Sequence, residues 1–349
     1  MDTHLSSTKI KIAVVGVNFG RWIVEDLTTP GGANDLFELV AVCDLDPERV
    51  RAIAGKAGVE AFTDLDALLA RNDIPAVGLF TGPVGRAGLL RKILDAGKDV
   101  ITTKPFELDP VAALKILKEA RDEGRVLHLN SPGPLLSPDL LQIKKWEQEF
   151  QLGRPVGCRA DVWASYREQP DGTWLDDPQK CPVAPIFRLG IYLINDLIEL
   201  FGEADRVQVM HSRIFTGRPT PDNAQLGIAF KNGALANIFA SFCVNDDQYY
   251  SNSLTLNYEN GTIYRNVGRL PFAGGRTRLT LVARQGESPA KCESAEYGDA
   301  SGKYQWRAFH DAIRNRKLPG EVAPGRIVDG VRVIVAMARA EQSGMTEPV

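Results

Sequence analysis

The residues whose types and spacing most clearly suggest a chemical role follow the first apolar run of the chain. Ile10–Val15 reads as a strand, and Gly16, Asn18 and Gly20 lie between it and Trp22. A strand that enters a helix through a glycine turn directs backbone N–H groups and the positive helix end toward a pyrophosphate. The complete fingerprint is G-x-G-x-x-G, and this loop is one residue shorter. Because Asn tolerates positive φ, the turn stays feasible. We expect a dinucleotide phosphate loop made by Gly16, Asn18, Phe19, Gly20 and Arg21, the alternative being a plain strand-to-helix turn.

An acidic residue ends the second predicted strand. Asp44 follows Leu39–Cys43, about 24 residues beyond Gly20. An acid at this place hydrogen-bonds the ribose 2′-OH of NAD and repels the 2′-phosphate of NADP. No arginine directly follows Asp44 to receive such a phosphate. The sequence therefore predicts NAD rather than NADP, with Asp46 as a cap for the helix that begins at Pro47.

A lysine follows the fourth predicted strand, Asp99–Thr102, in the run Thr103-Lys104-Pro105. The carboxyl ends of parallel strands meet at one edge of a sheet, which is where the cofactor is expected. Lys104 is therefore predicted beside the cofactor. The alternative is that Lys104 only caps a strand end at the surface.

A helix predicted over Ile186–Phe201 is apolar nearly throughout, yet it carries a polar stripe. Four polar residues at spacings of four, three and four share one face: Arg188, Tyr192, Asn195 and Glu199. A phenol can give a proton to a developing alkoxide or accept one from an alcohol, so Tyr192 is a candidate acid–base group. Nearby Lys104 and Arg188 would lower its pKa from about 10. The alternative, preferred for Glu199, is the solvated side of an amphipathic helix.

These residues need a scaffold, and the first third of the chain supplies one. From Lys9 to about Leu129, short apolar strands alternate with amphipathic helices, which is the pattern of an α/β fold with a parallel sheet. The predicted strands are Ile10–Val15, Leu39–Cys43, Ala76–Phe80, Asp99–Thr102 and Val126–Asn130. The predicted helices are Glu48–Gly55, Leu65–Ala70, Gly88–Ala96 and Pro110–Glu123. We expect a Rossmann-type domain over residues 1–131.

The pattern changes after Ser131, where closely spaced prolines and Gly133 mark a crossing into a second domain over residues 132–349. A helix is predicted over Asp139–Phe150, and closing helices over Lys303–Arg316 and Arg326–Gln342. Turn signals at Asn232-Gly233 and Asn260-Gly261 indicate an α+β domain with a largely antiparallel, open sheet. Its predicted strands are Cys158–Tyr166, Arg206–Phe215, Ala224–Phe230, Ala234–Cys243, Ser253–Tyr258, Thr262–Asn266 and Thr277–Arg284.

Composition excludes several classes of protein. The 349 residues are 44% hydrophobic and 24% charged with a net charge of −3, so two ordinary globular domains are expected and a nucleic-acid partner is not.

Five scattered cysteines indicate reduced thiols and a cytoplasmic location. No apolar run approaches the roughly 20 residues of a membrane helix, and Met1 to Thr8 is not a secretory signal. The four histidines lack metal-ligand spacing, so no metal is expected: His4, His128, His211 and His310.

Taken together, the motifs resemble the glucose-fructose oxidoreductase/inositol dehydrogenase (Gfo/Idh/MocA) family of two-domain NAD(P) enzymes. The resemblance covers nearly the whole chain and rests on the segments Gly16 to Trp22, Val42 to Pro47, Phe80 to Pro83, Ala96 to Val100, Lys104-Pro105, Gly172 to Trp174 and Gly190 to Asn195. The family's E-K-P lysine is catalytic and lies by the nicotinamide, and it matches Lys104, with Thr103 replacing the glutamate. The family's D-x-G-x-H motif matches Arg188 to Tyr192. Because a branch of the family has tyrosine in place of the histidine, Tyr192 is implied to transfer a proton.

The resemblance also implies a set of cofactor and substrate contacts, some of which the residues alone already suggest. It implies cofactor contacts from Asp44, Thr81, Pro83, Arg86, Lys104 and Pro105 besides the phosphate loop. It implies substrate contacts from Lys104, Trp174, Arg188, Tyr192 and Asn195. Arg86 stands where members often have histidine, and Val183-Ala184-Pro185 replaces glycines that usually precede the helix. The second-domain sheet is implied to join subunits into a homodimer or homotetramer.

The leading hypothesis is an NAD(P)-dependent oxidoreductase that moves hydride between nicotinamide and a secondary alcohol or carbonyl of a sugar, polyol or acidic sugar derivative. Tyr192 would transfer the hydroxyl proton, and Lys104 would orient the substrate oxygen. Arg188 in place of an acid predicts a bidentate contact with a substrate carboxylate or phosphate. The competing hypothesis is a non-catalytic, dinucleotide- or sugar-binding regulatory protein of the same fold, motivated by Arg188 and the short glycine loop.

Overall fold

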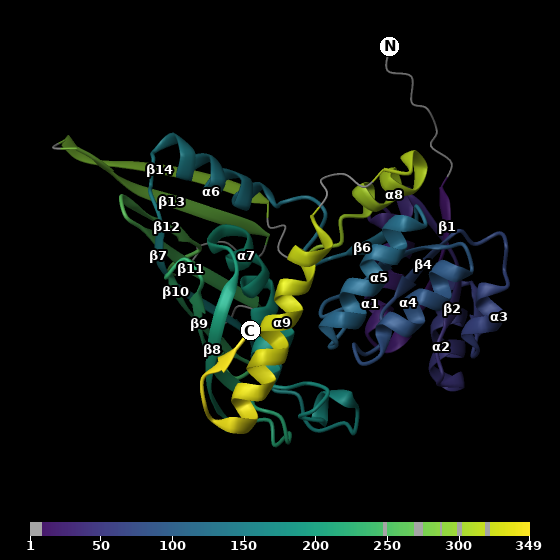
Figure 1. Ribbon diagram of the computed structural model, residues 1–349. Helices are drawn as coiled ribbons and strands as arrows, with labels where there is room; N and C mark the ends of the chain where they lie inside the picture. Colours follow the sequence, from purple (N-terminus) through teal and green to yellow (C-terminus); the bar gives the residue numbers. More distant parts are fainter. Residues whose placement is uncertain (1–8, 247–249, 269–274, 287, 299–301, 318–321) are drawn as a thin grey trace, which may run out of the picture. The chain divides into compact units, whose positions relative to one another are not determined.

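The chain folds into two compact units (Figure 1). The computed structural model describes residues 9–246, 250–268, 275–286, 288–298, 302–317 and 322–349. The first unit runs up to Leu135 and includes Lys303–Gly325, and the second comprises Leu136–Gly302 and Arg326–Val349. The boundary predicted at residues 131 and 132 therefore lies close to the observed crossing. However, the predicted second domain of residues 132–349 misses the return of 303–325 to the first unit.

The first unit is built on a six-stranded sheet in the order β3-β2-β1-β4-β5-β6. Every neighbouring pair is parallel, which confirms the predicted Rossmann-type sheet. The strands are β1 Ile10–Val15, β2 Phe37–Cys43, β3 Glu60–Phe62, β4 Ala76–Leu79, β5 Asp99–Thr102 and β6 Leu127–Leu129. The edge strand β3 was not predicted, because its three residues lack an apolar run. The strand order reverses between β1 and β4, and ligands bind at the carboxyl ends of strands beside such a reversal.

Helices connect these strands, and the local sequence fixes where they begin. They are α1 Val17–Thr28, α2 Pro47–Ala57, α3 Leu65–Leu69, α4 Arg86–Asp95 and α5 Pro110–Asp122, with a 3-10 turn at Ala33–Asp35. The predicted cap at Asp46 is confirmed, since its carboxylate accepts the N–H groups of Glu48 and Arg49 at 3.0 Å. Asp109 caps α5 in the same way. Such caps each stabilise a helix by about 1 kcal/mol.

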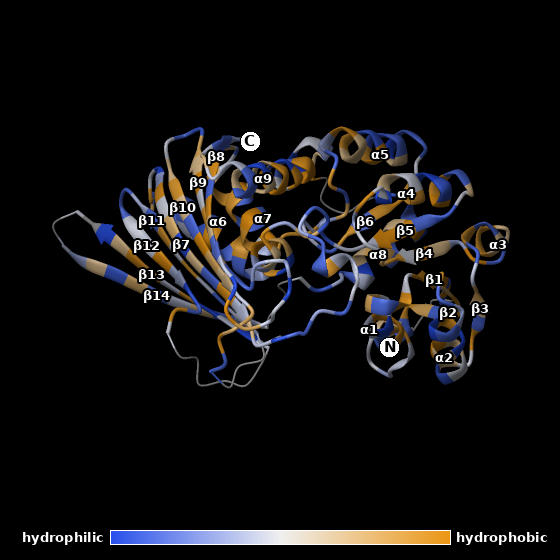
Figure 2. Ribbon diagram, turned by 90° about the horizontal axis from the view of Figure 1, so that it is seen from below, coloured by the Kyte–Doolittle hydropathy of each residue, from blue (hydrophilic) through white to orange (hydrophobic). Residues whose placement is uncertain are grey.

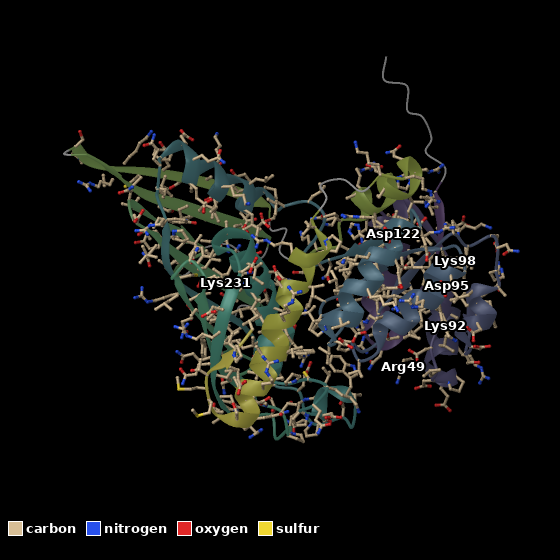
Figure 3. The ribbon with its side chains drawn as sticks, in the orientation of Figure 1. Arg49, Lys92, Asp95, Lys98, Asp122 and Lys231 are labelled. Carbon is tan, nitrogen blue, oxygen red and sulfur yellow. The ribbon has the colours of Figure 1, made fainter. Side chains whose placement is uncertain are left out.

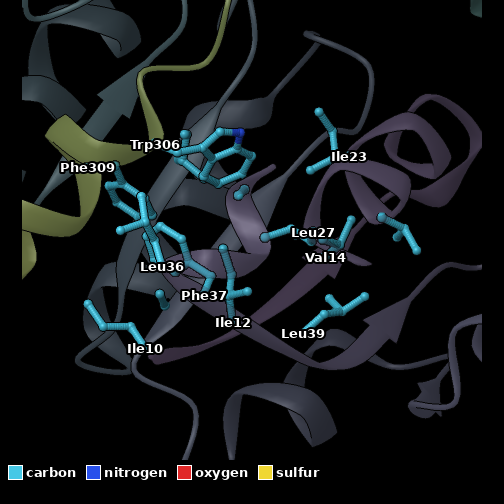
Figure 4. Close-up of a cluster of buried hydrophobic side chains, with 14 of the residues drawn as sticks. Ile10, Ile12, Val14, Ile23, Leu27, Leu36, Phe37, Leu39, Trp306 and Phe309 are labelled. Carbon is cyan, nitrogen blue, oxygen red and sulfur yellow. The ribbon is translucent and has the colours of Figure 1, made fainter. Parts of the chain in front are cut away.

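A helix from the far end of the chain completes the core of the first unit. In Figure 4, Trp306 and Phe309 of α8 (Trp306–Asn315) lie beside Phe37 of β2. The Phe37 ring stacks on Phe309 and meets Trp306 edge-on, each at a centroid distance of 5.5 Å. The Trp306 indole also donates to Asp26 of α1 at 2.6 Å. The predicted helix is therefore present, and its apolar face belongs to the first unit.

The second unit is built on a nine-stranded sheet in the order β14-β13-β12-β11-β7-β10-β9-β8-β15. β7 and β10 pair in parallel and the remaining pairs are antiparallel, so the largely antiparallel sheet is confirmed. β14 is polar and exposed and was not predicted. The strands are β7 Pro155–Ala164, β8 Ala204–Ser212, β9 Asn223–Phe230, β10 Leu235–Ser241, β11 Tyr250–Tyr258, β12 Gly261–Arg265, β13 Arg276–Gln285, β14 Ser288–Gly298 and β15 Glu347–Pro348.

Three helices lie on one face of this sheet (Figure 2): α6 Pro138–Glu149, α7 Ile191–Phe201 and α9 Pro324–Ser343. The helix predicted from Ile186 begins with one wider π turn, Ile186–Gly190, and continues as α7. A 3-10 turn at Trp174–Asp176 lies in the loop before it. Among the helices that the structure describes, none combines the length and the apolar character needed to cross a membrane.

Candidate functional site

The glycine turn that the sequence predicts between the first strand and the first helix is present in the first unit. Gly16 has a φ of +83° and precedes α1, which begins without a side-chain cap. A Cβ at Gly16 would lie 2.8 Å from the Thr81 backbone N, and one at Gly20 would lie 3.0 Å from Val14 Cγ1. The first glycine thus permits a left-handed turn against the end of β4, and the second permits close packing of α1 on β1. Asn18 lies inside α1, so the positive φ belongs to Gly16 alone in this loop.

These features fit the pyrophosphate of a dinucleotide. The N-terminus of α1 opens at the sheet edge where the strand order reverses, and helix N-termini favour anions. Asn18, Phe19 and Arg21 are exposed on the first turn. The Arg21 guanidinium lies 5.2 Å from the Trp22 ring centre.

Replacing Gly16 with Ala is expected to weaken cofactor binding, raising the Kd for NADH by at least about tenfold. The new methyl group would meet backbone atoms of Phe80 and Thr81 and force α1 away from β4. Fluorescence titration with NADH measures the change. Gly58→Ala is the matched control, because Gly58 has a φ of +69° with open space around it. Equal NADH affinities of the two variants would refute the close-packing role of Gly16.

Asp44 lies directly beside the phosphate loop. Its Oδ2 accepts the Val17 N–H at 2.8 Å, and its Oδ1 accepts the Asp46 N–H at 3.0 Å. Arg49, labelled in Figure 3, donates to Asp44 Oδ1 at 3.1 Å and pairs with Asp46 at 3.0 Å. Arg49 does not directly follow Asp44 in the sequence, but the first turn of α2 brings it back to the strand end. Carboxylate and guanidinium thus stand together at the predicted ribose position.

Lys104 follows β5 at the same sheet edge and is half-buried. Its backbone N–H donates to the Asn130 side chain at 3.0 Å, just after β6, and its peptide bond to Pro105 is cis. Thr102, at the end of β5, donates to the Leu79 carbonyl at 2.7 Å. The strands therefore bring the lysine to the edge where the sequence predicts it.

Arg86, which is predicted to contact the cofactor, is a buried residue at the start of α4. Its side chain is only 2% exposed. Its guanidinium donates to the carbonyls of Thr103 at 2.6 Å, Pro105 at 2.8 Å, and Thr81. Burial lowers the pKa of Arg86 to about 10, so it stays charged near neutral pH. A guanidinium occupied in this way holds two loops together and presents little surface to a ligand.

Tyr192 and Asn195 lie on α7 in the second unit, both half-buried. The Tyr192 ring lies beside Gly302, where a Cβ would come within 3.0 Å of the phenol oxygen. The Asn195 amide oxygen lies against Gly330 of α9, where a Cβ would overlap it. Both polar side chains therefore lie beside glycines that leave them room.

Arg188 is held by its own chain. Its guanidinium carbon lies 4.9 Å from the centre of the Tyr166 ring and 4.8 Å from that of Phe242, and these two rings stack on each other at 5.5 Å. It donates to both carboxylate oxygens of Glu168, at 2.6 and 2.9 Å. Burial alone would lower the pKa of Arg188, but Glu168 outweighs it and the pKa is raised. The sequence predicts a bidentate contact of Arg188 with a substrate carboxylate or phosphate, whereas in the structure the carboxylate of Glu168 makes this contact. Sequence reasoning missed Glu168, because nothing in the intervening loop signals the pairing.

A second buried arginine extends this network to Trp174. Arg218 pairs with Asp176, with Asp171 at 3.3 Å and with Glu168 at 3.6 Å. Asp176 belongs to the same 3-10 turn as Trp174, which is half-buried. Two arginines therefore face three carboxylates around the predicted substrate residues, and this network carries a net negative charge.

Among the described residues, no group of three His, Cys, Asp or Glu side chains is placed to hold a metal ion, and His4 lies outside those residues. His128, on β6, is buried against Phe309, and burial lowers its pKa to about 3. It is therefore a neutral residue of the core.

Comparisons with known proteins agree with this architecture. The chain is similar to D-apiose dehydrogenase from Paraburkholderia graminis, 23% identical over 59% of this chain and 54% of that protein. It is also similar to UDP-N-acetylglucosamine 3-dehydrogenase from Acidithiobacillus ferrooxidans, 24% identical over 88% and 94% of the two chains. A solved NAD binding oxidoreductase from Klebsiella pneumoniae shares the fold, with a TM-score of 0.71, 16% identity and coverage of 98% and 99%. The chain spans about half the length of several curated relatives it matches.

Two family descriptions match successive parts of the chain. Residues 10–131 match the "Oxidoreductase family, NAD-binding Rossmann fold", and residues 140–264 match the "GFO/IDH/MocA C-terminal domain". The two matches fall on the parallel sheet and on the second unit. The chain therefore belongs to the GFO/IDH/MocA family of oxidoreductases.

Proposed function

We propose that the protein is an NAD-dependent dehydrogenase or reductase that interconverts a secondary alcohol and a carbonyl of a sugar or polyol. The observation that carries this proposal is the joint placement of the Gly16 turn, Asp44 and Lys104 at one edge of the parallel sheet. Two relatives are named as dehydrogenases of apiose and of UDP-N-acetylglucosamine, which favours a hydroxyl-rich substrate.

The proposed chemistry divides between the bound group and the side chains. When bound, the cofactor would supply hydride transfer to or from its nicotinamide. The backbone N–H groups at the start of α1 would hold its pyrophosphate, and the Asp44 carboxylate would accept a hydrogen bond from its adenosine ribose. Lys104 Nζ orients the substrate oxygen. Tyr192 Oη takes the hydroxyl proton during oxidation and gives it back during reduction.

Asp44 supports NAD over NADP, because a 2′-phosphate would meet its carboxylate. Arg49 does not reverse this preference, since its guanidinium is already paired with Asp44 and Asp46. The decisive experiment gives the purified protein NAD or NADP with a panel of sugars and polyols, and NADH with the matching keto-sugars. Turnover of panel members with NAD supports the proposal. NADH binding without turnover of any member would instead support the non-catalytic regulator.

The charge around Arg188 supports a neutral substrate over an acidic one. An anionic sugar would compete with Glu168 for a guanidinium that already has two charged hydrogen bonds, and it would meet the net negative charge of the surrounding carboxylates. We therefore propose a neutral sugar or polyol in place of the acidic derivative that Arg188 alone suggests.

Replacing Glu168 with Gln is expected to release the Arg188 guanidinium. The kcat/KM ratio of an anionic to a neutral sugar should then rise about tenfold, since a hydrogen bond to a charged group contributes about 1.5 to 3 kcal/mol. Steady-state kinetics with matched uronate and aldose pairs measures the ratio. Glu259→Gln is the control, because Glu259 forms a similar double contact with Arg154 on the exposed surface. An unaltered ratio in Glu168→Gln would contradict the assignment.

We further propose that subunits associate through the sheet face opposite the three helices. On β7, buried Ala160 and Val162 alternate with half-buried Asp161 and Trp163, which therefore lie on the outer face. On β10, half-buried Phe239 also lies on this outer face. Analytical ultracentrifugation tests for a dimer or tetramer, and a monomer at micromolar concentration would contradict this arrangement.

A further inference from the structure

Arg86 makes contacts that concentrate on one short segment of the chain. Its Nη1 donates to the carbonyls of Thr103 and Pro105, which are the residues immediately before and after Lys104. Its Nη2 donates to the Thr81 carbonyl in the turn that follows β4. One buried cation therefore binds the backbone on both sides of the lysine and ties it to the neighbouring strand end.

The same segment is tied back to the helix that carries Arg86. Glu107 is buried, and its Oε2 accepts the Ala87 N–H at the start of α4 at 2.7 Å. Its Oε1 accepts the Leu108 N–H at 2.7 Å. The Lys104 N–H is bound by Asn130 on the other side. The start of α4 and the segment of residues 103–107 thus hold each other in both directions, and Arg86 supplies the contacts nearest the lysine.

We propose that Arg86 is a positioning residue that fixes the backbone of Lys104 and so aims its ammonium group. The inference rests on the proposed role of Lys104 in the reaction. Without the guanidinium, buried carbonyls on both sides of Lys104 lose their donor, and the segment must shift to find others. A displacement of about 1 Å at a catalytic group can lower a rate about 10²-fold. A methionine fills much of the same volume but donates nothing, so it isolates this function.

The chain offers a matched control at the opposite end of the same strand. Lys98, labelled in Figure 3, is buried just before β5, and its ammonium donates to the carbonyls of Arg71 at 2.7 Å and Ile74 at 2.8 Å. Lys98→Met therefore also removes a buried cation from backbone carbonyls of the first unit. It does so at the amino end of β5, away from Lys104.

The experiment compares Arg86→Met with Lys98→Met in the full chain. Both should lower the Tm. Only Arg86→Met should lower kcat at saturating NAD and substrate, by at least about tenfold, with the Kd for NADH unchanged within about a factor of three. Only Arg86→Met should change the rate at which Lys104 is reductively methylated by formaldehyde and cyanoborohydride, followed by mass spectrometry of the Lys104 peptide. Arg86→Lys keeps the charge but has fewer hydrogen-bond donors, so its kcat and its rate of Lys104 labelling should lie between those of wild type and Arg86→Met. If Arg86→Met does not fold, Arg86→Lys takes its place in the comparison.

Two results would overturn the inference. An increase of at least about tenfold in the Kd for NADH with kcat unchanged would make Arg86 a cofactor contact instead. If Arg86→Met and Lys98→Met have the same kcat and the same rate of Lys104 labelling, Arg86 is a structural residue only. The labelling rate needs no turnover, so it decides the position of Lys104 even if the proposed reaction is wrong.

Discussion

Replacing Tyr192 with Phe is expected to lower kcat by about 10²- to 10⁴-fold, the usual contribution of a positioned acid–base group. The substitution removes the phenol oxygen and keeps the ring, which lies beside Gly302. The packing of α7 should therefore remain, and the affinity for NADH should not change. Stopped-flow or steady-state measurement of NADH formation on the best substrate of the panel gives the rate.

The control for this result is Tyr297→Phe. Tyr297 lies on β14 in the same unit, and its hydroxyl donates to Gln142 at 2.8 Å. Its replacement removes one phenol hydrogen bond away from α7, and kcat should stay at the wild-type value. A Tyr192→Phe enzyme that keeps more than about a tenth of the wild-type kcat would rule out Tyr192 as the proton-transfer group, because that residual rate is too high for loss of the acid–base residue.

The parts of the molecule that sequence predicts well are those in which nearby residues decide the structure. The cap at Asp46 needs only the N–H groups two and three residues onward, and the Gly16 turn needs only a glycine between an apolar strand and a helix. Parallel strands bury both faces, so their apolar runs are easy to recognise. The positions of Asp44 and Lys104 at strand ends follow from the same periodicity.

The parts that sequence does not predict depend on pairs of residues distant in the chain. Glu168 meets Arg188 through a loop whose path no local pattern fixes. The stripe on the predicted helix identifies Arg188 as a polar residue, but it cannot show whether the partner is a substrate or the chain itself. Arg86 is similar, because a charged residue after a turn normally indicates surface. Only the three carbonyls around it reveal why it is buried.

The domain boundary illustrates the same division. The helix over Trp306–Asn315 is evident from its periodicity, whereas its partner is not. Its apolar face packs on the first unit, because Trp306 and Phe309 fit against Phe37. Arg316, just after the helix, adds a pair to buried Asp99 at 2.8 Å. A contiguous second domain is therefore the natural expectation from sequence and differs from the fold.

Replacing Arg265 with Met is expected to lower the free energy of unfolding of the second unit by about 3 to 5 kcal/mol, because it leaves buried charges without their partner. Arg265, on β12, is 3% exposed and donates to Asp139 of α6 at 3.0 Å and to Asp196 of α7 at 2.8 Å. One guanidinium thus compensates two carboxylates from two helices, and its loss leaves both unpaired.

The pKa of Asp196 determines how the stability deficit of Arg265→Met changes with pH. Burial raises the pKa of Asp196 to about 6, although Arg265 opposes the shift. A carboxyl with a raised folded-state pKa favours folding while it is protonated, and that contribution is lost as the pH rises through about 6. Without Arg265 the opposing effect disappears, so the pKa should rise further and the deficit of the variant should be larger at about pH 8 than at about pH 5.

Urea unfolding followed by fluorescence at both pH values measures the two deficits. Arg278→Met is the control, because Arg278 pairs with Glu296 on the exposed surface, where such a pair contributes at most about 1 kcal/mol. A deficit in Arg265→Met that is no larger than the control, or one that shrinks with rising pH, would show that the two carboxylates do not depend on Arg265. The larger deficit at high pH is the outcome that a shared buried cation requires, because only ionised carboxylates need it.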